Sequence, residues 1–388
     1  MDRKKSAILS LSLLTIICTD TVAPLVKQIG DSFPQVSQTL IKQTITLPSL
    51  MAIFFGLISG QLVKVMSKKT ILLIGLVLYS IGGLAAGWAQ DFTNHLILRA
   101  MVGAGAGLIS PIITSLITDY FQGKERADLV GYSFAISHFM AVLTPPLASM
   151  IGAHNWRNAF WIFALAPLVL IYVMISLPAS PRVKQDRQME KIKTPIPSAV
   201  LGYSLAALVM MIFFFIVVTD LPYLFETKPG ISPIVSTFGL SVCTLGSTLA
   251  GLMFSRMYQK LKKWTVPVGL AVCAIGIFLL TFSEWGVLIL VGLLIAGWGS
   301  GLLIALIVLA TSNAVGDADS TAAVGVVNGA FSIGIFLSPF FQASLPRVFG
   351  APQSIQFNFV LSGIVSALFA LLSLAFILLR RRKLSNGF

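Results

Sequence analysis

The sequence is poor in charged residues. Only 11% of its 388 residues are charged, whereas 56% are hydrophobic. Soluble domains carry about 25% charged residues, and a soluble chain of this size could not cover its apolar surface with so few. The composition therefore excludes a soluble enzyme, a disordered chain and a nucleic-acid-binding domain, and it indicates a polytopic membrane protein.

Residues that build metal and catalytic sites are also scarce. The three histidines are not spaced with carboxylates or cysteines as metal ligands, and Cys18, Cys243 and Cys273 all lie within apolar runs. No phosphate-binding Gly-Lys-Ser/Thr sequence occurs, and the glycine-rich residues 103–107 follow no strand. We therefore predict no metal, no cofactor and no enzymatic activity. Transport energy is expected to come from an ion gradient or from the substrate's own gradient.

Long apolar runs fill most of the chain. A helix that crosses a bilayer needs about 20 apolar residues. The sequence contains twelve such candidates, at residues 7–26, 43–66, 70–90, 95–117, 129–152, 158–178, 198–224, 233–255, 265–283, 286–311, 322–345 and 355–380. The first span is expected to be retained, because Asp20 interrupts it and no cleavage site follows.

The longest polar stretch of the sequence separates two sets of six spans. It predicts a six-helix bundle at 1–180, a cytoplasmic linker at 181–194 and a second six-helix bundle at 195–388.

The distribution of basic residues predicts the orientation in the membrane. If both termini are cytoplasmic, 21 of the 27 Lys and Arg residues fall on cytoplasmic segments, five fall outside and Arg99 lies within a span. Cytoplasmic loops of membrane proteins carry an excess of Lys and Arg. We therefore expect a multi-pass protein of the cytoplasmic membrane with both termini inside.

The two halves repeat weakly. A shift of 194 residues places Gly107 on Gly301, Gly131 on Gly325 and Pro145 on Pro339. A shift of 200 places Thr19-Asp20 on Thr219-Asp220. These matches predict a duplicated six-helix unit, and parallel repeats with a site between the halves are typical of transporters.

Three segments resemble motifs of the major facilitator superfamily. They are Leu96-x-x-Arg99-x-x-Val102-Gly103-x-Gly105-Ala106-Gly107, Asp119-Tyr120-Phe121 through Lys124-Glu125-Arg126-Ala127 with Gly131, and Trp156-Arg157-x-x-Phe160-Trp161. The whole chain is similar to this superfamily, and most to its twelve-helix drug:proton antiporter branch. The resemblance implies an all-α membrane protein with two pseudo-symmetric bundles of six helices.

The sequence departs from the superfamily pattern in two places. Helix 5 keeps Gly131 and Pro145 but has other residues where the family has glycine: Met140, Thr144, Ala148 and Ser149. In the helix 2–3 loop, Lys64 stands where the family has an acidic residue. We expect a swapped polarity, with Lys64 facing Asp317 or Asp319 across the two halves. The alternative is that Lys64 is one more inside-positive charge and the two Asp cap helix 11. The residues assigned to conformational motifs are Gly60, Lys64, Lys68, Lys69, Gly103, Gly107, Gly131, Pro145, Asp317, Asp319 and Pro339.

Ionisable groups within spans are candidates for proton coupling, because they are costly to bury in a membrane. Asp20 and Arg99 are predicted at similar depth, in two helices that line the central cavity in the superfamily, and could pair. A carboxyl group in low dielectric can bind and release protons near neutral pH, whereas Arg99 would stay charged. The alternative for Arg99 is that its side chain reaches the outer surface. His138 in helix 5 could relay protons or could bond a neighbouring helix.

Helix 7 carries the candidate substrate residues. Asp220 is the repeat partner of Asp20, and aromatic residues on the same helix would suit lipophilic cations. The predicted cavity residues are Asp220, Tyr203, Phe214 and Tyr223. The alternatives are an Asp220 that faces water at the interface and aromatic residues that only pack.

We therefore predict a secondary active transporter, an exporter that exchanges protons for amphipathic or cationic small molecules by alternating access. The alternatives are an exporter or importer of a specific metabolite and, more remotely, a membrane receptor or integral membrane enzyme. The expected partners are a small-molecule substrate, protons and the lipid bilayer. We expect a monomer and no nucleic acid.

Overall fold

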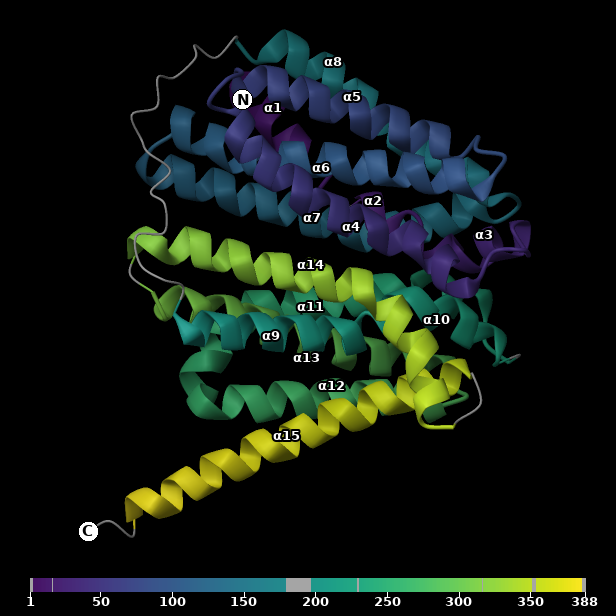
Figure 1. Cartoon of the computed structure of the whole chain (residues 1–388), viewed down its shortest axis with the longest axis vertical. Coiled ribbons are helices and arrows are strands. Elements are labelled where there is room, and N and C mark those ends of the chain that lie inside the picture. The colour runs from purple at the N-terminus through teal and green to yellow at the C-terminus, as the bar shows by residue number, and fades with distance from the viewer. Residues whose placement is uncertain are drawn as a thin grey trace. The chain divides into compact units, whose positions relative to one another are not determined.

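The structure is a computed structural model that describes residues 3–15, 17–178, 197–228, 230–315, 317–350 and 354–385. It is all-α in these ranges and divides into two compact units, Met1–Lys193 and Thr194–Phe388. Figure 1 shows that the helices of each unit lie side by side as long rods.

The first unit contains eight α-helices and two 3-10 helices in its described part. They are α1 (Arg3–Ser12), α2 (Ile17–Asp20), η1 (Ala23–Leu25), α3 (Val26–Ser32), α4 (Gln38–Leu62), α5 (Lys68–Ala86), α6 (Phe92–Tyr120), α7 (Gly123–Gly152), η2 (Trp156–Ala164) and α8 (Leu165–Ser176). Side chains of Ser37, Ser67 and Asp91 accept hydrogen bonds from the first turns of α4, α5 and α6. These caps fix where the helices begin, because the first amides of a helix lack backbone partners.

The second unit has seven α-helices and one 3-10 helix in its described part. They are α9 (Ser198–Phe214), α10 (Ile216–Glu226), α11 (Pro233–Leu261), η3 (Lys262–Trp264), α12 (Thr265–Phe282), α13 (Gly286–Asn313), α14 (Asp317–Val348) and α15 (Ile355–Ser385). Part of its core joins α9 to α14, where Val200, Ala207 and Met211 pack on Val327 and Phe331.

The described residues contain eleven helical runs that are long and apolar enough to cross a membrane. One of them, Pro233–Phe282, contains both α11 and α12, joined by η3. Dividing this run at η3 gives one helical segment for each of the twelve predicted spans. The chain is a multi-pass membrane protein.

The first span is not the continuous helix predicted for residues 7–26. It is broken into α1, α2, η1 and α3 (Figure 1). Pro24 lies in η1 and has no amide hydrogen to donate. The amide of Val22 donates to the Thr19 carbonyl (3.2 Å), a 3-10 pattern that departs from the α-helical one. The break therefore leaves carbonyl groups of the first span available to other partners.

Glycines set the packing of α6 against both of its neighbours. A Cβ atom on Gly103 would lie 2.3 Å from the Pro48 carbonyl oxygen of α4, and one on Gly107 would lie 2.4 Å from that of Ala52. A Cβ on Gly105 would lie 2.5 Å from the Gly75 carbonyl oxygen of α5. Close approach of backbones through small residues is the usual means of helix association in membranes. Alternate glycines thus place α6 between α4 and α5.

The second unit repeats this arrangement at α13. Cβ atoms on Gly297 and Gly301 would lie 1.9 Å and 2.5 Å from carbonyl oxygens of α11, and one on Gly299 would lie 2.7 Å from the Cys273 amide of α12. These three glycines are those of α6 shifted by 194 residues. Glycines that the weak sequence repeat relates therefore allow the same close helix packing in each unit.

Candidate functional site

Arg99 is the centre of the candidate coupling site in the first unit. It lies on α6 and is fully buried. Its Nε donates to the Thr44 carbonyl (2.8 Å), and its Nη2 donates to the Cys18 carbonyl. Its guanidinium carbon also lies 5.8 Å from the centre of the Phe163 ring. The predicted alternative, in which Arg99 reaches the surface, does not occur in this structure.

Local breaks in two helices supply the carbonyls that hold Arg99. Thr44 lies four residues before Pro48, which has no amide hydrogen to donate back to it. Cys18 lies four residues before Val22, whose amide donates to Thr19 instead. The guanidinium therefore donates to two carbonyl groups, those of Thr44 and Cys18, that would accept backbone amide hydrogens in a regular helix.

Asp20 is the last residue of α2, two residues after the carbonyl that Arg99 binds. Its Oδ2 is buried and has no hydrogen-bond partner, and the Nη1 of Arg99 is likewise buried and unpaired. No ion pair joins Asp20 to Arg99 within the described residues. The carboxyl group and the guanidinium thus lie in the same buried region, each with one polar atom free. An acid in such a place can gain or lose a proton without breaking a salt bridge.

Tyr79 and Cys18 complete the surroundings of the two charged groups. The charges of Asp20 and Arg99 interact electrostatically with both side chains. The Tyr79 hydroxyl donates to the Leu14 carbonyl (2.8 Å), so α5 is fixed to the segment between α1 and α2. Sequence reasoning missed Tyr79, because a single tyrosine in an apolar span carries no signal of its own.

His138 lies half-buried on α7. Its neighbour Ser137 donates to the Ser12 carbonyl (3.0 Å), and Ser133 shares a hydrogen bond with the Ser12 hydroxyl (2.5 Å). These contacts fix α7 against α1, near the break in the first span. A role of His138 in proton relay stays a prediction.

Asp220 lies in a separate polar network of the second unit. It is fully buried on α10, so it does not face water as the alternative reading had it. Its Oδ2 accepts from the Thr219 hydroxyl (2.8 Å), which in turn accepts from Gln342 Nε2 of α14 (3.1 Å). Gln342 also donates to Ser338 (2.9 Å). The network connects the C-terminal part of the seventh predicted span to α14. Sequence reasoning missed Gln342 and Ser338, because both lie within an apolar run.

The four residues predicted for a substrate cavity fall into two places. Tyr203 and Phe214 line an apolar cavity of about 810 Å³ within the second unit. Asp220 and Tyr223 lie beyond the helix break at Phe215 and are buried elsewhere. The expectation that one wall combines these aromatic and acidic groups is therefore not met within this unit.

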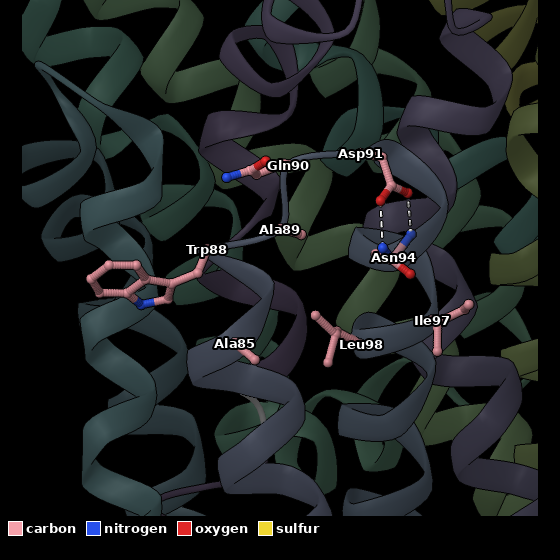
Figure 2. A pocket seen from close by; sticks show the side chains of 8 residues that line it. All are labelled: Ala85, Trp88, Ala89, Gln90, Asp91, Asn94, Ile97 and Leu98. Carbon is pink, nitrogen blue, oxygen red and sulfur yellow. Dashed lines mark hydrogen bonds between the residues drawn. The ribbon is translucent and has the colours of Figure 1, made fainter.

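A second, shallower cavity of about 540 Å³ lies where α5 ends and α6 begins (Figure 2). Asp91 and Asn94 face one another across the first turn of α6, while the Trp88 ring points away from them. The Asp91 carboxylate is used in capping, since it accepts from the Asn94 amide at 2.8 Å and also from the Asn94 side chain. The cavity contains none of the predicted site residues, and we assign it no role.

The loop between α4 and α5 is held by its lysines. Lys68 Nζ forms an ion pair with Asp119 of α6 (2.5 Å), and Lys69 donates to the Met174 carbonyl (2.8 Å) and to that of Leu177, at the end of α8. Cations at a helix C-terminus interact favourably with its last carbonyls. Lys64 is exposed and donates to Gln61 within its own loop (2.8 Å).

Among the other motif residues, Gly103 and Gly107 pack α6 closely on α4, as described above. Gly60, Gly131 and Gly325 face open space, whereas Pro145 and Pro339 are buried in α7 and α14. The side chains of Asp317 and Asp319 lie outside the described part of the chain, so their predicted pairing with Lys64 stays a prediction.

Replacing Lys68 by methionine should destabilise the first unit. Lys68→Met removes the charge that pairs with Asp119, and the Lys68 side chain is only 6% exposed. We expect a loss of about 1–3 kcal/mol, between the values for exposed and buried ion pairs. Thermal unfolding in detergent measures it. Lys64→Met is the control, since Lys64 lies in the same loop but is exposed. Equal melting temperatures for the two variants would contradict the assignment.

Comparisons with known proteins decide the family. A sequence profile of the Major Facilitator Superfamily matches residues 8–232 and 203–387, which together cover nearly the whole chain. The chain belongs to this superfamily. It is a transporter and not an enzyme.

Several superfamily members are similar in sequence. The quinolone resistance protein NorA of Staphylococcus aureus is 24% identical over 333 residues, which are 80% of this chain and 81% of that protein. A triacylglyceride transporter of Mycolicibacterium smegmatis is 22% identical over 52% of this chain, and the multidrug transporter MdtP of Bacillus subtilis is 28% identical over 27% of it. These two matches span only 36% and 20% of the relatives' own lengths.

Solved structures confirm the major facilitator fold. A D-xylose-proton symporter aligns with a TM-score of 0.75 at 18% identity, over 95% of this chain and 96% of that one. A bacterial homologue of the human lysosomal transporter Spinster aligns with a TM-score of 0.76 at 17% identity, over 97% and 96%. At these identities the alignments establish the fold alone.

Proposed function

We propose that this superfamily transporter exports amphipathic, cationic small molecules in exchange for protons. The single observation that carries the proposal is the buried and unpaired Oδ2 of Asp20, two residues after the Cys18 carbonyl that the buried Arg99 binds. The names of NorA and MdtP support efflux as the direction. We further propose that the protein works as a monomer in the cytoplasmic membrane with both termini inside.

Asp20 is the proposed proton carrier. Its neutral form suits the buried environment, and its ionised form would be stabilised by Arg99, whose Nη1 has an unused N–H group. Arg99 keeps its charge throughout and therefore acts as the fixed partner. Protonation of Asp20 would decide whether α2 is drawn toward α6. Alternating access would then move residues 1–180 against 195–388.

Proton release on substrate binding tests this assignment directly. Adding a lipophilic cation to the purified protein in weakly buffered detergent solution should acidify the medium, because substrate binding would displace the proton of Asp20. The Asp20→Asn variant should bind the compound without acidification. Equal acidification by both proteins would contradict the role of Asp20.

Asp220→Asn should weaken transport of cationic substrates more than of neutral ones. The buried carboxyl group of Asp220 holds a network with Thr219 and Gln342, and it supplies negative charge in the second unit. We expect a difference of about tenfold between the two substrate classes, the scale of one lost interaction with a charged group. Competition assays with matched cationic and neutral compounds measure it. An equal loss for both classes would indicate a structural or gating role.

Reversing the charge at Lys64 should shift the conformational balance. If Lys64 pairs with Asp317 or Asp319, Lys64→Asp favours the inward-open state, and adding Asp317→Lys and Asp319→Lys restores the balance. A partly exposed pair contributes up to about 1 kcal/mol, which changes a two-state population several-fold. Accessibility labelling of introduced cysteines reports the populations. A triple variant no closer to the wild type than Lys64→Asp would exclude the pair.

A further inference from the structure

The 810 Å³ cavity of the second unit has a chemistry that differs from that of the proposed transport site. Four helices line it: α9, α12, α13 and α15. None of its lining residues carries a charge. Of its polar lining residues, Ser373 donates to the Ala370 carbonyl within α15 (2.8 Å). The walls are aliphatic and aromatic.

The cavity is an open groove along one side of the unit. Large apolar residues of its rim are exposed, among them Leu205 of α9 (63%) and Leu372 of α15 (55%). In Figure 1, α15 diverges from α12 toward its C-terminal end. Exposed apolar surface of a membrane protein faces lipid, so the groove is open to the acyl chains of the bilayer.

The groove extends through the depth of one leaflet. Along α9 it runs from Gly202 to Phe214, a distance of about 18 Å at 1.5 Å per residue. The hydrocarbon core of a bilayer is about 30 Å thick, so one leaflet contributes about 15 Å. The lining residues of α12, from Val266 to Cys273, begin one residue after the start of that helix. The groove therefore begins at one membrane boundary and ends near the midplane.

Basic residues stand at the boundary end of the groove. Lys262 and Lys263 are the first two residues of η3, directly before α12, and both are exposed. Lys262 adopts a φ of 48°, a backbone conformation that favours glycine, and is the single non-glycine residue with positive φ in the described ranges. A lysine thus occupies a position whose backbone favours glycine.

We propose that this groove binds one acyl chain of an anionic phospholipid, with the headgroup at Lys262 and Lys263. The apolar walls match a hydrocarbon chain in length and chemistry, and clusters of Lys and Arg at the membrane boundary bind acidic headgroups. A cationic transport substrate fits poorly here, because the groove offers no carboxylate and its mouth is positively charged. The lipid site is independent of the proposed proton coupling.

Native mass spectrometry of the full chain, incubated with equal amounts of phosphatidylglycerol and phosphatidylcholine of identical chains, tests the proposal. The wild type should retain one phosphatidylglycerol with a preference of about thirtyfold, the scale that two nearby cations give at about 1 kcal/mol each. Gly202→Trp should reduce bound lipid of both classes about tenfold, because a Cβ on Gly202 meets open space and the indole would fill the groove. Ala206→Phe, at a second lining position, should act in the same way.

Two further variants separate chain binding from headgroup binding. Gly251→Trp is the matched control, since Gly251 is exposed on α11, faces open space and does not line the groove. It should bind lipid as the wild type does. Lys262→Gly with Lys263→Ser should keep one bound lipid but lose the preference for the anionic headgroup, and glycine also suits the backbone at position 262.

Three results would overturn the proposal. The first is equal retention of both lipids by the wild type. The second is undiminished lipid in both Gly202→Trp and Ala206→Phe. The third is a dimer that these groove variants dissociate, which would assign the groove to a second copy of the chain. None of these measurements depends on transport, so they stand apart from tests of the proposed function.

Discussion

Asp20→Asn is expected to reduce proton-driven transport to below about 1% of the wild-type rate, the scale on which removal of an essential proton-transfer group acts. The substitution keeps the size of the side chain but fixes it in a neutral form, two residues after the Cys18 carbonyl that Arg99 binds. Substrate binding should survive in part, because the substitution prevents proton exchange at position 20 but leaves the protein folded. Uphill transport into proteoliposomes and equilibrium binding in detergent measure the two effects separately.

Asp31→Asn is the matched control for this prediction. Asp31 lies at the exposed end of the same broken span and pairs with Lys27 at 2.6 Å. An exposed pair of this kind contributes at most about 1 kcal/mol, so transport by the Asp31→Asn protein should stay near normal. Normal uphill transport by a well-folded Asp20→Asn protein would refute the assignment of Asp20 as the proton carrier.

Gly297→Val is expected to have the largest effect on stability. A Cβ at this position would lie 1.9 Å from the Cys243 carbonyl oxygen of α11, so α11 and α13 would have to separate. Overpacking costs about 1–3 kcal/mol where side chains can adjust, and a backbone contact adjusts less, so we expect at least about 3 kcal/mol. Thermal unfolding and the monodisperse fraction after purification report this loss.

Gly325→Val provides the control within the same unit. A Cβ on Gly325 meets nothing within 4 Å, so valine there should leave the melting temperature nearly unchanged. Gly103→Val, at the repeat position in the first unit, should act like Gly297→Val. Similar melting temperatures for Gly297→Val and Gly325→Val would show that the close approach of α11 and α13 is not a constraint on stability.

The sequence was sufficient to predict the spans, which follow from long apolar runs, and the fold class, which the resemblance of three segments to the superfamily implies. Alternate glycines of α6 and α13 are visible in the sequence, but the reason for them, close contact with neighbouring backbones, comes from the structure. The break in the first span was not predicted. Hydropathy does not distinguish a continuous apolar helix from one that Pro24 and a 3-10 turn interrupt.

The contacts of the candidate site could not be predicted from the composition of the chain. Arg99 binds the Thr44 carbonyl because Pro48 cannot, and that relation becomes visible only when α4 and α6 are placed together. Likewise, the bend at Phe215 separates Tyr203 and Phe214 from Asp220, although one helical span contains them all. Residues that are close in sequence on this span therefore do not all line the same cavity.

The most direct test of proton-coupled export is transport by the purified protein in liposomes with an imposed pH gradient. An amphipathic cation should accumulate against its own gradient on the side from which protons leave. Accumulation should stop when a protonophore collapses the pH gradient. Transport that equilibrates the compound but never concentrates it, whatever the pH gradient, would contradict the account.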